Sequence, residues 1–264
     1  MRNAEDGSRR YGNAKRVWHN SQRGAPREER VYTMETTTIF ATRTTLNECS
    51  KGLEFVSNGD GTCAVSGIGT CTDINVKIPS VYNGEKVTGI GDEAFWRCAN
   101  LTGVAIPEGV TSIGELAFFD CTSLKDIALP DGLTSIGEGA FEYCRSLTSI
   151  TIPDSVTEIA RRAFSNCSAL VDICLSNGLK KIGGDAFYNC TGLTSITIPD
   201  SVTEIGYFAF AKCDGLTNIT IPSRVMTIGE CAFSGCSGLT SISIPKNTII
   251  GFQAFHGIPE VVEK

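Results

Sequence analysis

Residues 198–220 read IPDSVTEIGYFAFAKCDGLTNIT, and a similar 23-residue unit recurs from about residue 78 to residue 255. Phenylalanine marks the period: it stands every 23 residues from Phe95 to Phe233, and Phe255 follows 22 residues later. Cysteine keeps the same spacing from Cys98 to Cys236. A repeat of this length, with several residue types in phase, predicts a solenoid in which each unit forms one coil.

The second half of the unit predicts a short β-strand with one buried face. Leu216, Ile219 and Ile221 point to one side of an extended chain, and Asn218 and Thr220 point to the other. The proline that follows cannot donate a hydrogen bond to a neighbouring strand, so we expect the strand to end there. Stacked units would then form a parallel sheet, with strands about 4.8 Å apart.

The first half of the unit predicts a bend and a turn. Residues 202–205 form a second, shorter extended piece. Gly206 would allow the tight bend after it, although Ala160 at the equivalent place in its own unit shows that a positive φ is not required there. The spacing of Phe210 and Cys213 is compatible with one helical or 3₁₀ turn that places the phenylalanine in the core.

The chain divides into three parts. Residues 1–47 are polar, without hydrophobic periodicity, and predict a disordered tail or an extended gene start; they contain no apolar core of the kind found in a secretory signal. Residues 48–77 predict an N-terminal β-hairpin around the turn at 58–61, which would cap the stack. Residues 78–264 hold about eight repeats, after an insertion in which Asn83-Gly84 predicts a tight turn.

Charge and composition exclude several classes of function. Residues 1–33 carry 8 Lys and Arg against 4 Asp and Glu, so the remainder carries 15 against 25. An acidic repeat array argues against nucleic acid as a partner, because phosphate contacts need clustered basic residues. No apolar run approaches the 18 residues of a membrane span.

Chemistry-bearing residues are scarce in the repeats. Seven of the 12 cysteines belong to the repeat ladder and predict a column of buried free thiols. The sequence has no C-x-x-C pair and only two histidines, so we expect no metal site. It also shows no nucleophile elbow and no acid pair in a predicted cleft. We therefore expect no catalytic residues, no cofactor and no enzymatic activity.

The string I-P-x-x-V-T-x-I-G-x-x-A-F-x-x-C-x-x-L-T-x-I resembles the BspA-like leucine-rich repeat family over about residues 71–256. The resemblance implies an α/β solenoid: a curved right-handed superhelix with a parallel sheet on its concave side and short helical or 3₁₀ turns opposite. Members are often surface or secreted proteins that bind host proteins, other cells or matrix. The resemblance therefore implies a surface or secreted location, with a cytoplasmic one as the alternative.

The outward strand positions are the best candidates for a binding face. They form two columns of small, mostly polar side chains on a shallow surface that suits a broad protein contact. The candidate residues are Asp126, Ser149, Thr151, Asp172, Cys174, Ser195, Thr197, Asn218, Thr220, Ser241 and Ser243. Cys174 stands where its neighbours carry Thr or Ser, so we expect it to be an exposed thiol.

Aromatic residues beside the phenylalanine ladder form a second candidate surface. Exposed together they would be interface material, whereas packed between turns they would be structural. They are Trp96, Phe119, Tyr143, Tyr188, Tyr207 and Phe208.

Three functions remain open from the sequence. The first is a non-enzymatic protein-binding or adhesion module whose partner the sequence does not name. The second is an intracellular scaffolding array. The third is ice or crystal binding through the Thr and Ser columns, although Asp126, Asp172 and Cys174 interrupt those columns.

Overall fold

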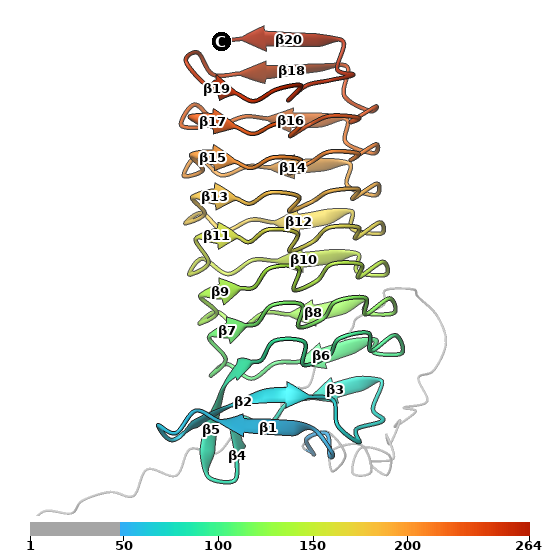
Figure 1. The fold of residues 1–264 in the computed structure, drawn as a ribbon, viewed down its shortest axis with the longest axis vertical. Coiled ribbons are helices and arrows are strands. Elements are labelled where there is room, and N and C mark those ends of the chain that lie inside the picture. The colour runs from blue at the N-terminus through green and yellow to red at the C-terminus, as the bar shows by residue number, and fades with distance from the viewer. Residues whose placement is uncertain (1–47) are drawn as a thin grey trace, which may run out of the picture. The chain divides into compact units, whose positions relative to one another are not determined.

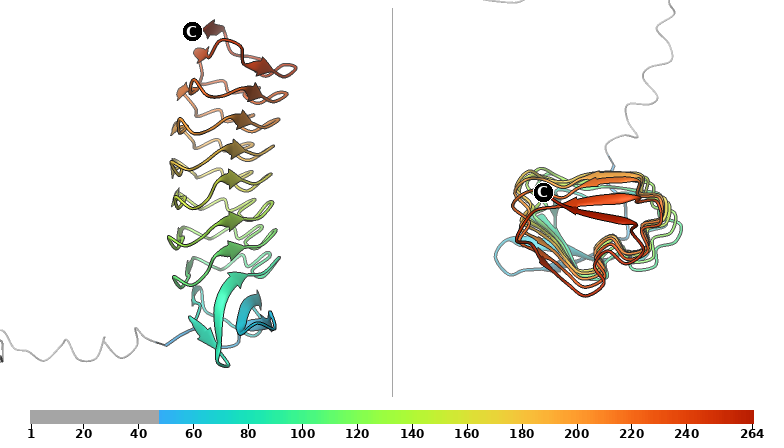
Figure 2. Two further views of the ribbon diagram at one scale, coloured as in Figure 1. Left: turned by 90° about the vertical axis from the view of Figure 1, so that its left-hand side faces the viewer. Right: turned by 90° about the horizontal axis from the view of Figure 1, so that it is seen from above.

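A computed structural model describes residues 48–264 of the protein, and the predicted tail at 1–47 lies outside the described residues. The repeats form a β-solenoid of stacked coils (Figure 1). Seen along the axis of the stack, successive coils superpose closely (Figure 2). The solenoid prediction is therefore confirmed. The expected curvature, handedness and domain boundaries stay predictions.

One side of each coil is a strand of three or four residues, and we call the outward surface of these strands the strand face. Neighbouring strands run parallel and in the register of the repeat: Ser149 pairs with Asp172, and Thr151 with Cys174. The strands are β3 (Asn75–Lys77), β6 (Gly103–Ala105), β8 (Asp126–Ala128), β10 (Ser149–Thr151), β12 (Asp172–Cys174), β14 (Ser195–Thr197), β16 (Asn218–Thr220), β18 (Ser241–Ile244) and β20 (Glu260–Glu263).

A second side of each coil is a short strand, which has six residues in β5 and two residues in each later coil. These strands form two parallel ladders: one runs from β5 through β7 to β9, and the other from β11 to β19. The members are β5 (Glu85–Ile90), β7 (Ser112–Ile113), β9 (Ser135–Ile136), β11 (Glu158–Ile159), β13 (Lys181–Ile182), β15 (Glu204–Ile205), β17 (Thr227–Ile228) and β19 (Ile249–Ile250).

The N-terminal part contains the predicted hairpin. Strands β1 (Glu54–Ser57) and β2 (Thr62–Gly67) pair antiparallel, and β2 then pairs parallel with β5. Strand β4 (Val81–Tyr82) pairs antiparallel with β5 around Asn83 and Gly84, whose φ angles of 50° and 86° confirm the predicted tight turn. That the hairpin caps the stack stays a prediction.

The third side of each coil, which we call the hook, runs from the glycine after the two-residue strand to the cysteine, as in residues 206–213. The predicted helical or 3₁₀ turn there is wrong, since residues 48–264 contain no helix, and the fold class is all-β. Two hook residues, Phe208 and Lys212, have φ angles of 51° and 58°, which a right-handed helix cannot contain.

Hydrogen bonds between coils explain why the hook is not helical. The N–H groups of Phe208, Phe210 and Lys212 donate to carbonyls of the next coil at 2.8–2.9 Å. The N–H groups between them close tight turns within the hook, for example Ala211 to Phe208 at 3.0 Å. Every second donor is thus used by the neighbouring coil, and no continuous helical ladder can form.

The core consists of residue columns that the repeat stacks on one another. The ladder phenylalanines from Phe95 to Phe255 stack in sequence with ring centroids 5.1–5.7 Å apart. Phe95 and the six phenylalanines that follow it are fully buried. The sequence prediction that these side chains fill the interior is confirmed.

The cysteine column fills the core and also links neighbouring coils through hydrogen bonds. The thiols of Cys121, Cys144, Cys167, Cys190, Cys213 and Cys236 are buried, and each donates to a phenylalanine carbonyl of the previous coil at 3.0–3.2 Å. Cys98, at the first coil, is only partly buried. The predicted buried ladder is confirmed for the six later coils. Its hydrogen bonds between coils could not be foreseen, because the acceptors lie 26 residues away.

The glycine column is explained by the close approach of adjacent coils. Gly206 has no positive φ, which agrees with the expectation that none is required at this position. A Cβ on Gly206 would lie 2.5 Å from the backbone nitrogen of Gly184 in the previous coil. Glycine is therefore needed because adjacent backbones approach closely.

Replacing Gly206 with Val should lower the free energy of unfolding by about 3 kcal/mol, because the neighbour of the added side chain is backbone and cannot turn aside. Valine is chosen because the coil with Ala160 already accommodates a methyl group in this column. Gly132→Ala is the control: its Cβ would meet nothing nearer than 3.6 Å, so we expect a change within about 0.5 kcal/mol. Urea titrations of both variants measure the difference, and equal stabilities would contradict the close-approach explanation.

Candidate binding face

The strand face places the predicted residues outward on consecutive coils. In β10, Ser149 and Thr151 are exposed while Ile150 between them is buried, and β8, β12, β14 and β16 repeat this pattern. Ser241 is exposed and Ser243 is half-buried in β18. The side-chain directions follow from strand alternation. That this face binds a partner stays a prediction at this point.

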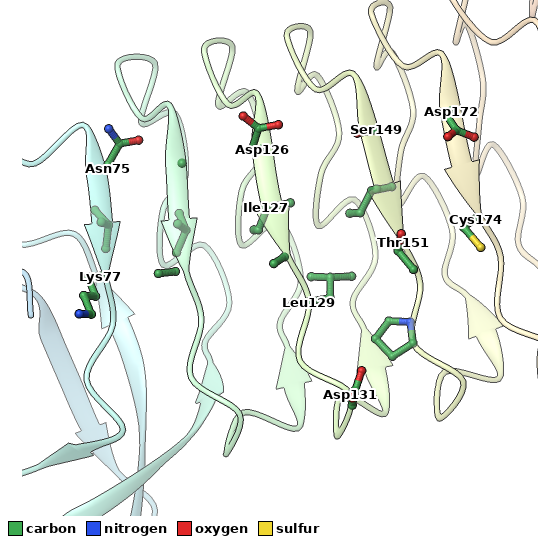
Figure 3. A pocket seen from close by; sticks show the side chains of 17 residues that line it. Asn75, Lys77, Asp126, Ile127, Leu129, Asp131, Ser149, Thr151, Asp172 and Cys174 are labelled. Atoms are coloured by element: carbon green, nitrogen blue, oxygen red, sulfur yellow. The ribbon is translucent and has the colours of Figure 1, made fainter. Parts of the chain in front are cut away.

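The strand face is not uniform, because a hollow of about 810 Å³ lies over strands β3 to β12 (Figure 3). Its outward positions include the smallest in the columns: Gly103, Ala105 and Ala128. The sequence predicted a shallow surface without deep pockets, and the hollow is the departure from that expectation. It forms where neighbouring outward side chains are short enough to leave space above the sheet.

One contact fixes the shape of the hollow at its first strands. Asn75 accepts a hydrogen bond from the Thr102 hydroxyl at 2.8 Å, which holds its amide beside β6. A Cβ on Gly103 would lie 2.9 Å from the Asn75 side-chain oxygen. A larger residue at position 103 would therefore displace Asn75 and fill this end of the hollow.

The predicted residues divide into two groups around the hollow. Asp126, Ser149, Thr151, Asp172 and Cys174 line it and come from three different coils. The other predicted residues lie on β14, β16 and β18 and do not line it; they are Ser195, Thr197, Asn218, Thr220, Ser241 and Ser243.

The prediction missed the residues that β3 contributes. Asn75 and Lys77 line the hollow and occupy the same two columns, since Asn75 pairs with Gly103 and Lys77 with Ala105. The signal was present in the sequence, but the insertion before β6 changes the spacing from 23 to 28 residues and hides it. Counting strand positions back across the insertion would have found both residues.

Acidic side chains dominate the charge of the hollow. Asp126, Asp131 and Asp172 line it together with Lys77. Within residues 48–264 none of the three carboxylates forms an ion pair, so each keeps its charge available to a partner. Carboxylates on a shallow surface attract basic side chains and set the orientation of an approaching protein.

Cys174 is exposed at the edge of the hollow, as predicted, and it is the exposed cysteine among those of residues 48–264. The six later ladder cysteines are buried and their thiol pKa values are raised by burial; that of Cys236 rises to about 12. Since the thiolate is the reactive form, we expect the ladder thiols to be unreactive under native conditions.

The second candidate surface, the aromatic residues of the hooks, is mixed in exposure. Trp96 and Tyr207 are exposed, at 45% and 42%, while the other four are half-buried. Trp96 and Phe119 stack with centroids 6.3 Å apart, and Phe119 meets Tyr143 edge-on at 5.5 Å. Phe119 and Tyr143 thus pack between coils, whereas Phe208 meets the exposed Tyr207 of its own coil edge-on at 6.3 Å.

The repeats of this chain match a known protein family. The model of the BspA type leucine-rich repeat region matches residues 88–214 and 160–262, in six copies. These segments together cover well over half of the chain. The protein belongs to the BspA-type leucine-rich repeat family.

Two solved structures resemble this BspA-type protein over most of its length. The leucine-rich repeat protein of T. pallidum is 29% identical, covers 79% of this chain and 87% of its own, and gives a TM-score of 0.58. A leucine-rich cell surface protein from Faecalibacterium prausnitzii is 27% identical, covers 81% and 76% respectively, and gives a TM-score of 0.54. Comparison with curated proteins gave no match.

Proposed function

We propose that this BspA-type protein binds another protein through the strand face, with the hollow over β3 to β12 as the centre of the contact. The observation that carries the proposal is the hollow itself, which combines a floor of small residues with three carboxylates that have no ion-pair partner in residues 48–264. A protruding loop that carries a basic side chain fits both properties. No residue set in the hollow supports a reaction.

A cell-surface location is the second part of this proposal, and it makes the protein an adhesion module. It is supported by the F. prausnitzii relative, which is described as a cell surface protein. The alternative is a scaffold inside the cell. No helix within residues 48–264 is long and apolar enough to cross a membrane. Fractionation of the source cells separates the two locations, and a wholly cytosolic protein would rule out adhesion.

We also propose that the β1–β2 hairpin caps the N-terminal end of the stack. Leu53, Cys63 and Val65 are buried and belong to the same core as Val87 and Ile90 of β5. A terminal coil without a cover would expose this apolar surface to water. The hairpin therefore has a structural use apart from recognition.

Filling the hollow should abolish partner binding. Ala128→Arg places a long cationic side chain on the floor, beside Asp126, and we expect affinity for the partner to fall at least about tenfold because the contact is blocked. Thr220→Lys is the matched control, since it adds a positive charge on the same face but outside the hollow. Both variants change exposed residues, so thermal unfolding should remain near that of the wild type.

The measurement is biolayer interferometry of the wild type and both variants against a panel of purified cell-surface and matrix proteins. A partner that binds the wild type and the Thr220 variant equally, but not the Ala128 variant, supports the proposal. Equal binding by all three proteins would exclude the hollow as the contact.

A further inference from the structure

One column of the hooks varies along the stack and buries polar side chains in its middle. The residue after the ladder phenylalanine is Trp96, Phe119 or Tyr188 in three coils and Ala211, Ser234 or His256 in the last three. In the two coils between Phe119 and Tyr188 it is Glu142 and Ser165. Glu142 is 9% exposed and Ser165 is 2% exposed. Among residues 48–264 there are three buried polar side chains, and two of them lie side by side in this column.

Burying Glu142 is not required by the fold. The same position accepts aromatic rings in other coils, and an apolar side chain costs less to bury than a carboxylate. Burial raises the pKa of Glu142, while the nearby Arg162 and a hydrogen bond from Ser165 oppose that rise. A carboxylate kept at such a cost, where packing does not need it, is typical of a binding site.

Glu142 and Ser165 line an open surface depression of about 390 Å³, which we call the hook pocket. This volume lies at the lower end of small-molecule sites, which begin at about 300 Å³. Aromatic rings and polar groups from four successive coils share the lining: Glu142, Tyr143, Arg162, Ser165, Asn166, Asp185, Tyr188 and Phe208. The amides are ordered, since Asn189 donates to Asn166 and Asn166 donates to Ser165, both at 2.9 Å.

Glu142 is the carboxylate of the pocket left without a close counter-ion. Asp185 is shared by Arg161 at 3.7 Å and Arg162 at 3.9 Å. Arg161 also pairs with Glu138 at 3.1 Å. Glu142 forms no ion pair with any residue of 48–264 within such distances. The pocket therefore combines three aromatic rings with a buried carboxylate that has Arg162 nearby but forms no ion pair with it.

The rings of this edge already accept cations from the chain itself. The Arg145 guanidinium lies 5.3 Å from the centroid of Tyr143, and the Lys212 ammonium lies 5.3 Å from that of Tyr188. Cations bind over the faces of such rings because the ring face is negative. A carboxylate and aromatic rings in one surface depression thus have the chemistry that holds an organic cation.

We propose that the hook pocket binds the ammonium group of an alkylamine, with Glu142 as its counter-ion and Tyr143, Tyr188 and Phe208 around its alkyl stem. A lysine side chain of a partner protein and a free amine share this chemistry. The hook pocket lies on the hooks and not on the strand face, so it is a second site that does not rest on the proposed function.

The test uses calorimetric titration of the whole protein at pH 7.5 and low salt with Nα-acetyl-lysine methylamide. Nα-acetyl-norleucine methylamide is the uncharged control ligand, and we expect it to bind at least about tenfold more weakly. Titration with n-butylamine identifies the source: binding equal to that of the lysine compound indicates a free amine, and much weaker binding indicates a protein lysine. Equal binding of the norleucine compound would overturn the proposal.

Glu142→Gln should weaken binding of the lysine compound at least about tenfold. It should not lower the midpoint of thermal unfolding, because it removes a buried charge and keeps a side chain that can accept a hydrogen bond. Glu115→Gln removes an exposed charge from the edge of another coil and should leave the affinity unchanged. Unchanged binding by the Glu142 variant would overturn the proposal. Ala128→Arg should leave amine binding intact, which separates this site from the strand face.

Discussion

Raising the pH from about 7.5 to 10 should unfold the repeat stack, because six ladder thiols must stay protonated while they are buried. An unfolded cysteine titrates near pH 8.5. Burial raises the pKa of Cys144, Cys167, Cys190 and Cys213 well above the ordinary value, raises that of Cys121 as well, and raises that of Cys236 to about 12. Above pH 8.5 the unfolded chain therefore binds fewer protons than the folded one, and stability falls as pH rises.

The expected effect is large. At pH 10 each such thiol favours the unfolded state by about 2 kcal/mol, since one pKa unit corresponds to about 1.4 kcal/mol. Six thiols give about 12 kcal/mol, which is as large as the whole stability of an ordinary domain. The stabilisation is fully present below about pH 8.5 and is lost progressively up to the folded pKa values.

Urea titrations at several pH values between 7.5 and 9.5, in a reducing buffer, measure this slope. Cys190→Ala should reduce the slope by about 1.4 kcal/mol per pH unit above pH 8.5, because one buried proton fewer is involved. Cys174→Ala is the control, since Cys174 is exposed and its removal should leave the slope unchanged. If the free energy of unfolding falls with pH by an amount that corresponds to two protons or fewer, most ladder thiols are not kept protonated by burial in the folded protein.

Phe164→Ala should lower the free energy of unfolding by about 3–5 kcal/mol, the cost typical of removing a buried aromatic side chain. The Phe164 ring is fully buried and stacks on Phe141 at 5.4 Å and on Phe187 at 5.6 Å, so both faces lose their contacts. The neighbouring rings cannot move together, because inter-coil hydrogen bonds fix their backbones. The substitution therefore leaves a cavity in the middle of the stack.

Urea unfolding of Phe164→Ala should be compared with that of Phe252→Ala. Phe252 is 72% exposed, and we expect its replacement to change stability by no more than about 0.5 kcal/mol. The half-buried Phe255 at the end of the ladder should give an intermediate effect, since it stacks on one ring, Phe233. Equal losses for the three variants would show that the ladder does not carry the stability of the array.

Some features of the candidate face could be predicted from the sequence, and others could not. Alternation along each strand predicted that Ser149 and Thr151 lie outward, and it did so because a β-strand leaves no other direction for them. The hollow was not predicted, because the register shows which small residues are neighbours but neither how much space lies above them nor the Thr102 contact that holds Asn75. The hook pocket was missed for the same reason: its lining comes from four coils.

The sequence by itself determined the period, the parallel register and the contents of the core. A strict 23-residue repeat places identical residues above one another, so Phe210 must meet Phe187 and Phe233 once the coils stack. Only the tertiary structure decided the path of the hooks, the need for Gly206 and the hydrogen bonds of the cysteines. These depend on carbonyls and backbone atoms of the adjacent coil, which no pattern within one repeat can place.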